Sequence, residues 1–308
     1  MGRVPETTMA GRSQALRRLQ AYASLALDAF LLRRDRPYLF ILVINDACNL
    51  DCFYCASKNT GRYELDYASV RSALSEAHDR GHRALVITGG EPMLWRSGGA
   101  ALADVVSQAR GIGFLDIAVF TNGTFPLDAD GATLIVTIDG TRDAHNALRA
   151  GTYDLILDHV RRARSKVLAS ITISKANERE LEDAVRAIAG TRLFEGITFN
   201  LLTQSPDMVS RHGLCGQERV RVLDRLWRLK GQGYPIILSR AAYRALRAND
   251  WRRPVKQIEL FAGGHLFQCC RDVGRPEICL ECGYSSCAEI SQALEGRPSA
   301  VLQLLRAK

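Results

Sequence analysis

The sequence of 308 residues lacks the features that mark membrane and exported proteins. Its N-terminal apolar segment, Ala21 to Leu32, is interrupted by Asp28, is too short to span a bilayer and has no small-residue cleavage site. Nucleic-acid-binding motifs are also absent, and the arginines behind the net charge of +8 are spread through helix-like segments. We therefore expect a cytoplasmic protein without a nucleic-acid partner. Contact with an anionic membrane surface is a less favoured use of the charge.

Cysteine, by contrast, is abundant. The chain has nine, gathered around residue 50 and between residues 269 and 287, with Cys215 alone between the two groups. Disulfide frameworks are typical of small secreted domains, whereas a chain of this length with 47% apolar residues can bury a full core without one. The grouping therefore indicates metal sites in a reducing compartment.

The first group, Cys48, Cys52 and Cys55, has the spacing C-x3-C-x2-C and lies in a stretch that follows the apolar run Tyr38 to Ile44. Three thiolates on one short loop can bind one soft metal centre, but they leave a four-site centre one ligand short. The open position is a place for a substrate or a cofactor. A zinc knuckle or three buried thiols are the alternatives, although zinc sites favour paired C-x2-C units with a fourth ligand nearby.

From residue 38 the sequence alternates between strand-like and helix-like segments. Predicted strands cover residues 38–44, 84–88, 115–120, 133–138, 167–173 and 197–202. Predicted helices cover residues 66–80, 99–110, 152–165, 178–189 and 216–230, and an amphipathic helix over residues 13–32 precedes them. Such alternation predicts a parallel α/β sheet, whose active site lies at the carboxyl ends of its strands. The cysteine loop falls at such an end.

A glycine-rich turn, Gly89-Gly90-Glu91-Pro92, follows the second predicted strand. Together with the cysteine motif, in which Tyr54 precedes the last cysteine, it resembles the radical S-adenosylmethionine (radical SAM) superfamily. The resemblance implies a partial (β/α)6 TIM-like barrel. It also implies a [4Fe-4S] cluster on the three cysteines, with S-adenosylmethionine bound to the open iron through its amino and carboxylate groups. The turn and Tyr54 are expected to contact this cofactor, the turn holding the methionine amino group.

Further matches surround the fourth predicted strand. Thr137-Ile138-Asp139-Gly140, then His145, then Arg149-Ala150-Gly151 resemble the family stretches S-x-D-G, H-D and R-G. The resemblance implies that Thr137 contacts the cofactor's ribose and that Arg149 binds its carboxylate, because a guanidinium can hold a carboxylate by two parallel hydrogen bonds. The chain departs from the pattern at Thr137, Asn146 and Ala150, and His145 is equally compatible with the surface. Asn122, after the third strand, is expected to face the cofactor or to cap a turn.

The second cysteine group belongs to a C-terminal region. Residues 258–269 predict a hairpin around Gly263-Gly264, and the cysteines of this region are Cys269, Cys270, Cys279, Cys282 and Cys287. Neighbouring strand residues face opposite sides, so only one of Cys269 and Cys270, with Cys269 favoured, is expected to join the other three. Four thiolates predict a closed second centre, with another [4Fe-4S] cluster favoured and structural zinc as the alternative.

The motifs divide the chain into four expected parts: residues 1–37, an N-terminal tail and helix; residues 38–205, the core partial barrel; residues 206–257, a helical connection; and residues 258–308, the cysteine-rich region. The resemblance implies an enzyme in which one electron from the cluster cleaves the cofactor to methionine and a 5'-deoxyadenosyl radical. That radical would abstract hydrogen from an organic substrate. An electron donor such as flavodoxin or ferredoxin is also implied.

The sequence does not specify the substrate. A small metabolite, a natural-product intermediate or a lipid is favoured over a ribosomal peptide, because the residues before the first strand are too few for a leader-binding domain. A peptide or protein maturase of the same superfamily is therefore the first alternative. A zinc-stabilised binding module without catalytic activity is the alternative from another class of protein.

Overall fold

A computed structural model describes Gln20, Ser24, Asp28 and residues 35–55, 63–203, 206–269 and 276–306. The amphipathic helix predicted over residues 13–32 lies outside these residues, except for Gln20, Ser24 and Asp28, each of which is helical. Within the described part of the chain, no helix is both long and apolar enough to cross a membrane.

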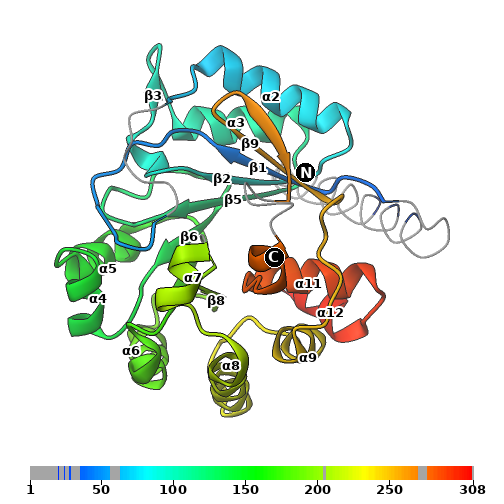
Figure 1. Cartoon of the computed structure of the whole chain (residues 1–308). Coiled ribbons are helices and arrows are strands. Elements are labelled where there is room, and N and C mark those ends of the chain that lie inside the picture. Colours follow the sequence, from blue (N-terminus) through cyan, green and yellow to red (C-terminus); the bar gives the residue numbers. More distant parts are fainter. Residues whose placement is uncertain are drawn as a thin grey trace, which may run out of the picture.

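An eight-stranded sheet runs through the centre of the molecule (Figure 1). Its strands are β1 (Leu39–Val43), β2 (Ala84–Thr88), β5 (Asp116–Thr121), β6 (Thr133–Thr137), β7 (Val167–Ile173), β8 (Ile197–Leu201), β9 (Ile258–Ala262) and β10 (His265–Gln268). Their order is β10-β9-β1-β2-β5-β6-β7-β8, and all neighbours are parallel except β9 and β10. The six predicted strands and their parallel arrangement are confirmed. A small separate hairpin consists of β3 (Arg96–Ser97) and β4 (Ala100–Ala101).

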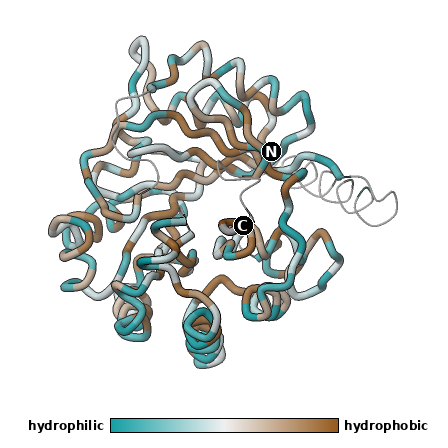
Figure 2. Tube along the Cα trace, in the orientation of Figure 1, coloured by the Kyte–Doolittle hydropathy of each residue, from teal (hydrophilic) through white to brown (hydrophobic). Residues whose placement is uncertain are grey.

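The two faces of the sheet have different neighbours, because successive side chains of a strand point to opposite sides. On the outer face, Phe40 and Val119 belong to the main hydrophobic core together with helix residues such as Leu74. On the inner face, Ile41 and Val86 line a cavity. Figure 2 shows the apolar residues concentrated along the central strands and more polar residues on the outer helices. Helices outside and a cavity inside are the arrangement of the predicted partial barrel.

Helices surround the sheet (Figure 1). They are α2 (Tyr67–Asp79), α3 (Leu102–Ile112), α4 (Arg142–Leu148), α5 (Tyr153–Arg162), α6 (Leu181–Thr191), α7 (Pro206–His212), α8 (Gly216–Gly231) and α9 (Arg240–Ala248), with short 3-10 turns η1 (Pro92–Leu94) and η2 (Glu178–Glu180). The predicted start of α2 is fixed by Asp66, whose carboxylate accepts a hydrogen bond from the Ser69 amide at 2.6 Å. The sequence did not predict α4 and α7, because each is too short to show an apolar period.

The C-terminal region joins the two sides of the barrel. Its hairpin is confirmed, but the sequence did not predict that β9 pairs with β1. Helix α11 (Ser285–Leu294) contributes Ile290 to an apolar cluster with Leu39 and Ile258, while the Ser285 amide donates to Asn200 Oδ1 of β8 at 3.3 Å. Helices α10 (Pro276–Leu280) and α12 (Pro298–Arg306) precede and follow α11. This packing carries the second cysteine group to the interior of the barrel.

Candidate active site

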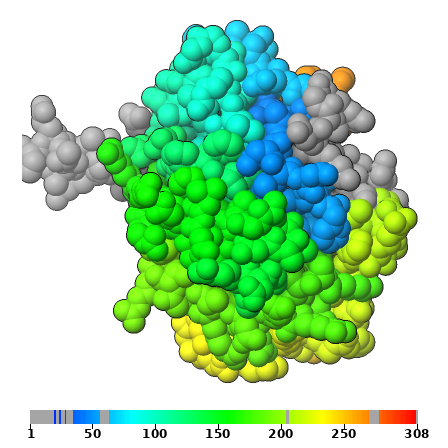
Figure 3. Space-filling model, turned by 90° about the vertical axis from the view of Figure 1, so that its left-hand side faces the viewer, coloured from blue at the N-terminus to red at the C-terminus, as the bar shows by residue number. Residues whose placement is uncertain are grey.

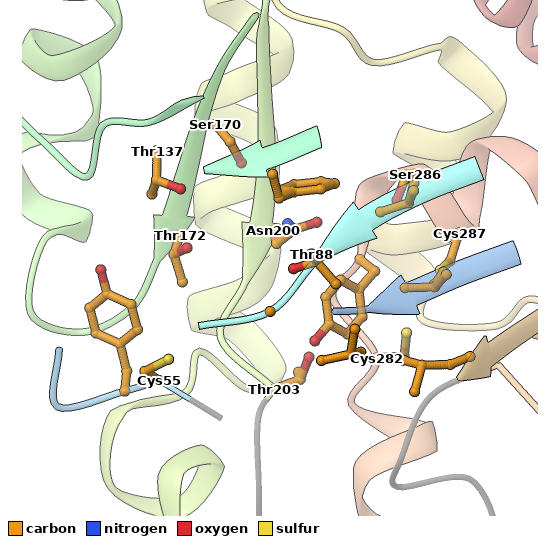
Figure 4. Close-up of a pocket in the computed structure, with 18 of the residues that line it drawn as sticks. Cys55, Thr88, Thr137, Ser170, Thr172, Asn200, Thr203, Cys282, Ser286 and Cys287 are labelled. Atoms are coloured by element: carbon orange, nitrogen blue, oxygen red, sulfur yellow. The ribbon is translucent and has the colours of Figure 1, made fainter. Parts of the chain in front are cut away.

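One cavity of about 330 Å³ lies on the inner face of the sheet. The predicted site residues that line it are Cys48, Cys52, Tyr54, Cys55, Gly89, Gly90, Asn122, Thr137, Arg149, Cys269, Cys279, Cys282 and Cys287. Of the predicted residues, Glu91 and Pro92 are not part of its lining. Figure 4 shows Cys55 on one side of the cavity and Cys282 and Cys287 on the other. The fold thus brings two cysteine groups, far apart in sequence, to one space.

The cysteine loop, residues 48–55, presents three free cysteines, of which Cys52 is buried. Cys48 Sγ accepts hydrogen bonds from the backbone amide of Leu50 at 3.4 Å and from the side-chain amide of Asn122 at 3.7 Å. Burial raises the pKa of the Cys48 and Cys52 thiols, so a bound metal has to stabilise their thiolates. Free thiols that face a cavity, one of them with N–H donors on its sulfur, fit an iron-sulfur cluster.

Side chains at the end of β5 hold the cysteine loop. Asn122 Nδ2 also donates to Asn49 Oδ1 at 2.9 Å, and Asn49 Nδ2 donates to Thr124 Oγ1 at 2.9 Å. Asn122 Oδ1 accepts from the Thr124 amide at 2.9 Å, so Asn122 caps its turn and also lines the cavity. In Figure 3 the blue segment that follows β1 lies directly against the green segments of the middle of the chain.

The glycines of the predicted turn are required by close packing. A Cβ at Gly90 would lie 2.1 Å from the carbonyl oxygen of Ala47, and a Cβ at Gly89 would lie 2.4 Å from Asn45 Oδ1. The Gly90 amide donates to the Asn45 carbonyl at 3.0 Å, and the Glu91 amide donates to the Ala47 carbonyl at 2.7 Å. The turn therefore lies flush against the segment that leads into the cysteine loop, and any side chain there would force the two apart.

Glu91 is fully buried, and both of its carboxylate oxygens accept hydrogen bonds from other groups of the protein. Oε1 accepts from the Met93 amide at 2.9 Å and from Thr121 Oγ1 at 2.8 Å, while Oε2 accepts from the Asn122 amide at 2.7 Å. Burial raises the pKa of Glu91, and these hydrogen bonds oppose that shift. Glu91 thus ties the glycine turn to the end of β5, whereas the sequence led us to expect its side chain at the cofactor.

Arg149, Asp139 and Tyr54 form a buried cluster beyond the end of β6. Arg149 Nε donates to Asp139 Oδ2 at 2.5 Å, and the Tyr54 hydroxyl donates to the same oxygen. The guanidinium carbon of Arg149 lies 5.6 Å from the centre of the Tyr54 ring. Burial alone would lower the pKa of Arg149, but the Asp139 carboxylate raises it, so the guanidinium stays charged. Arg149 and Tyr54 therefore reach the cavity, as predicted, in a fixed relation that the sequence did not indicate.

His145 is fully buried, so its interpretation as a surface residue is wrong. Its Nδ1 accepts from the Asp139 amide at 3.2 Å, and its Nε2 lies 3.1 Å from Thr152 Oγ1. Burial lowers the pKa of His145 to about 4, so the ring is neutral at pH 7. Ala150, where the family pattern has glycine, adopts a left-handed φ of 54° beside Arg149.

A polar wall faces the cavity from neighbouring strands. Thr137 of β6 pairs with Ser170 of β7, and Thr172, two residues further along β7, pairs with Asn200 of β8. These four hydrogen-bonding side chains form a patch across the three strands (Figure 4). Of these four residues, only Thr137 was predicted from the sequence. The alternation of polar and apolar residues in β8 and the polar positions Ser170 and Thr172 in β7 were signals that could have found the rest.

Two arginines hold the turn that carries Cys279 and Cys282. Arg253 Nε donates to the Cys279 carbonyl at 2.9 Å. The buried Arg219 donates from Nη1 to the Glu281 carbonyl at 3.1 Å and from Nη2 to the Cys282 carbonyl at 2.9 Å. Both guanidinium groups place positive charge beside the cysteines, which favours an anionic centre.

Cys269 follows β10 with a left-handed φ of 68° and lines the cavity, whereas Cys270 lies outside the described residues. The choice of Cys269 over Cys270 as a ligand stays a prediction. Among the residues that the structure describes, no three His, Cys, Asp or Glu side chains are arranged to hold a single metal ion.

Comparison with known proteins identifies the core. Residues 42–188 match the family model of the Radical SAM superfamily, a segment that includes the cysteine loop, the glycine turn and Arg149. The chain is 27% identical over 146 residues to a probable GTP 3',8-cyclase of Methanothermobacter thermautotrophicus, which covers 46% of this chain and 47% of the cyclase. It is 24% identical over 320 residues to the sporulation killing factor maturation protein SkfB of Bacillus subtilis, covering 92% of this chain and 75% of SkfB. The match therefore spans about half of the cyclase but most of SkfB.

The fold is similar to that of Streptococcus suis SuiB, solved in complex with its precursor peptide SuiA. The TM-score is 0.63 at 11% sequence identity, and the match covers 83% of this chain and 64% of SuiB. This likeness confirms the predicted partial barrel. Members of the matched superfamily are enzymes that use a [4Fe-4S] cluster and S-adenosylmethionine. With the cysteine loop and the glycine turn inside the matched segment, residues 42–188 of this chain form a radical SAM superfamily domain.

Proposed function

We propose that this enzyme cleaves S-adenosylmethionine reductively at a [4Fe-4S] cluster held by Cys48, Cys52 and Cys55, and that it abstracts hydrogen from an organic substrate. The observation that carries the proposal is that one cavity joins the cysteine loop, the buried Arg149 and the polar wall. When bound, the cluster and S-adenosylmethionine supply methionine and a 5'-deoxyadenosyl radical, which takes a hydrogen atom from the substrate and becomes 5'-deoxyadenosine.

The residues of the chain bind and orient the reactants. We assign the cofactor's carboxylate to the guanidinium of Arg149 and its amino group to the backbone of Gly89 and Gly90. Thr137 is assigned to the ribose, and Tyr54 to the wall beside the cofactor. Asn122 holds the loop through its contacts with Cys48 and Asn49. We expect the electron to come from a small donor such as flavodoxin or ferredoxin.

A second centre at Cys269, Cys279, Cys282 and Cys287 is part of the proposal. All four line the same cavity as the cysteine loop, and two guanidinium groups lie beside their turn. We favour a second [4Fe-4S] cluster, suited to electron transfer or to structure, with zinc in a four-cysteine site as the alternative.

A peptide is the substrate class that the comparisons favour. SkfB, a maturation protein, aligns with 92% of the chain, and SuiB was solved with a precursor peptide. These observations outweigh the expectation, drawn from the short N-terminal part, that a small metabolite, a natural-product intermediate or a lipid is preferred. Those substrates remain the second candidate, because the match to a GTP 3',8-cyclase covers only 46% of this chain.

Metal analysis of a variant with Cys48, Cys52 and Cys55 replaced by Ala tests both centres. The parent, purified without oxygen, should be brown and contain two clusters, and the variant should retain about four irons and four sulfides per chain. Zinc in place of iron and sulfide would make the C-terminal centre a structural zinc site. Absence of metal from the variant would refute the second centre, and unchanged iron content would refute the first.

A further inference from the structure

Asp139 accepts hydrogen bonds from several segments that meet inside the barrel. It lies two residues after the end of β6 and is fully buried. Its Oδ2 accepts from both Tyr54 and Arg149, and its Oδ1 accepts from the Thr172 amide at 2.7 Å. Three segments that are distant in sequence are therefore held by one carboxylate: the cysteine loop, the segment after α4, and the end of β7.

The backbone of Asp139 is itself held on both sides. Its amide donates to His145 Nδ1 at 3.2 Å, and its carbonyl accepts from Asn177 Nδ2 at 2.7 Å. Because the pKa of His145 is low, this ring nitrogen stays an acceptor at neutral pH. The carboxylate of Asp139 consequently has a fixed position from which to orient its partners.

Arg149 is the partner with unused hydrogen-bonding capacity. Its side chain is nearly buried and lines the cavity, and Asp139 is bound through Nε alone. Among the described residues, Nη1 and Nη2 have no hydrogen-bond acceptor in the protein. A buried guanidinium that is anchored at Nε and open at its two terminal nitrogens is suited to binding a carboxylate.

We propose that Asp139 is a positioning residue that fixes Arg149 and Tyr54 relative to each other, so that Arg149 presents its terminal nitrogens to the carboxylate of the bound cofactor. This inference rests on the proposed function, because it requires the amino-acid part of S-adenosylmethionine to lie at Arg149. Asp139 does not touch that ligand and acts through Arg149. Neutralising Asp139 leaves a buried guanidinium without its counter-ion and weakens the shared acceptor of Arg149 and Tyr54.

Two ligands separate positioning from general stability. S-adenosylhomocysteine carries the amino-acid carboxylate, and 5'-methylthioadenosine has the same adenosyl part without it. Binding of each to the anaerobically reconstituted enzyme is measured by calorimetry for the parent and for Asp139→Asn. We expect the affinity for S-adenosylhomocysteine to fall about ten-fold or more, and that for 5'-methylthioadenosine to stay within about three-fold. An equal loss for both ligands, or no loss for either, overturns the inference.

A matched control is available nearby. Asp154 forms an exposed ion pair with Arg142, with Arg142 Nη1 and Asp154 Oδ2 2.6 Å apart and side chains 59% and 60% exposed. Asp154→Asn removes an aspartate–arginine pair from the same stretch of chain and should change neither affinity, since exposed pairs contribute little. A selective loss in this variant would show that the effect does not depend on Asp139.

Two further outcomes are distinguishable. If Asp139→Asn does not fold, Asp139→Glu keeps the charge but moves it by one methylene, and the same selective loss is expected. Loss of both affinities in a folded Asp139→Glu variant contradicts positioning. If the parent binds neither ligand and forms no 5'-deoxyadenosine from S-adenosylmethionine, the proposed function has failed and not merely the role of Asp139.

Discussion

The side-chain amide of Asn122 lies 3.7 Å from Cys48 Sγ, so the end of β5 contacts the first cysteine of the cysteine loop directly. The same amide donates to Asn49, and the carbonyl of the side chain caps the turn at Thr124. Asn122 therefore both holds the cysteine loop in place and donates a hydrogen bond to the Cys48 sulfur. The contact should make the proposed cluster site sensitive to a side chain that is not a ligand.

Asn122→Ala should make the cluster more labile without preventing its assembly. The change removes an N–H donor from the Cys48 sulfur and one from Asn49, and its lost turn cap costs about 1 kcal/mol of stability. Iron extraction by a chelator, followed by visible absorbance, should be several-fold faster than in the parent. An unchanged extraction rate would show that the contact does not support the cluster.

Glu91→Gln distinguishes the structural role of Glu91 from the predicted contact with the cofactor. An amide in place of the carboxylate turns an N–H toward a backbone or hydroxyl donor, which should lower the free energy of unfolding by about 1 to 3 kcal/mol. Denaturant titration of the variant measures this loss. Full stability combined with loss of cofactor binding would instead support a direct contact with the amino group.

Glu289 on α11 should make stability depend on pH. Burial raises the pKa of this carboxyl from 4.5 to about 7; its Oε1 accepts from the Ser239 amide at 2.5 Å, while Oε2 has no partner among the described residues. The folded pKa exceeds the unfolded one, so the protonated form favours folding. That stabilisation is present below pH 4.5 and is lost as the pH rises through about 7, a change of about 3 kcal/mol.

Glu289→Gln cannot titrate, so its stability relative to the parent should increase between pH 5 and pH 8. Denaturant titrations at several pH values measure this difference, and Glu295→Gln, an exposed position after the same helix, is the control. A difference that does not change with pH would contradict the role of Glu289.

Arg219→Met should loosen the cysteine turn of the C-terminal region. The guanidinium donates to the carbonyls of Leu246, Glu281 and Cys282, and its loss leaves buried acceptors unpaired, at about 2 kcal/mol or more. Iron content and unfolding free energy should both fall. Arg221→Met on the same helix removes an exposed arginine and should leave both values unchanged. Equal behaviour of the two variants would show that Arg219 does not support the cysteine turn.

The sequence predicted the strands well because each is a short apolar run bounded by polar turns, as in Ala84–Thr88 before the glycine turn. It did not predict that β9 pairs with β1, because a pairing between residues 39–43 and 258–262 has no local signal. From the cysteine spacings we predicted a metal centre at each cysteine group. That the two groups share a cavity depends on how α11 packs, which no spacing reveals.

The roles of individual polar residues were harder to predict, because they too depend on contacts between segments that are distant in sequence. Residue type suited Glu91 to an amino group, but the direction of its carboxylate depends on donors at Thr121 and Asn122, which lie on another strand. Likewise, Tyr54 and Arg149 were identified separately. Their common attachment to Asp139 arises only when three distant segments meet.

Formation of 5'-deoxyadenosine tests the central claim most directly. The anaerobically reconstituted parent is incubated with S-adenosylmethionine and a strong one-electron reductant, and the product is quantified by mass spectrometry. The parent should form 5'-deoxyadenosine and methionine, and the single variants Cys48→Ala, Cys52→Ala and Cys55→Ala should form none while remaining folded. Cleavage that persists in all three variants would contradict the assignment of the cysteine loop.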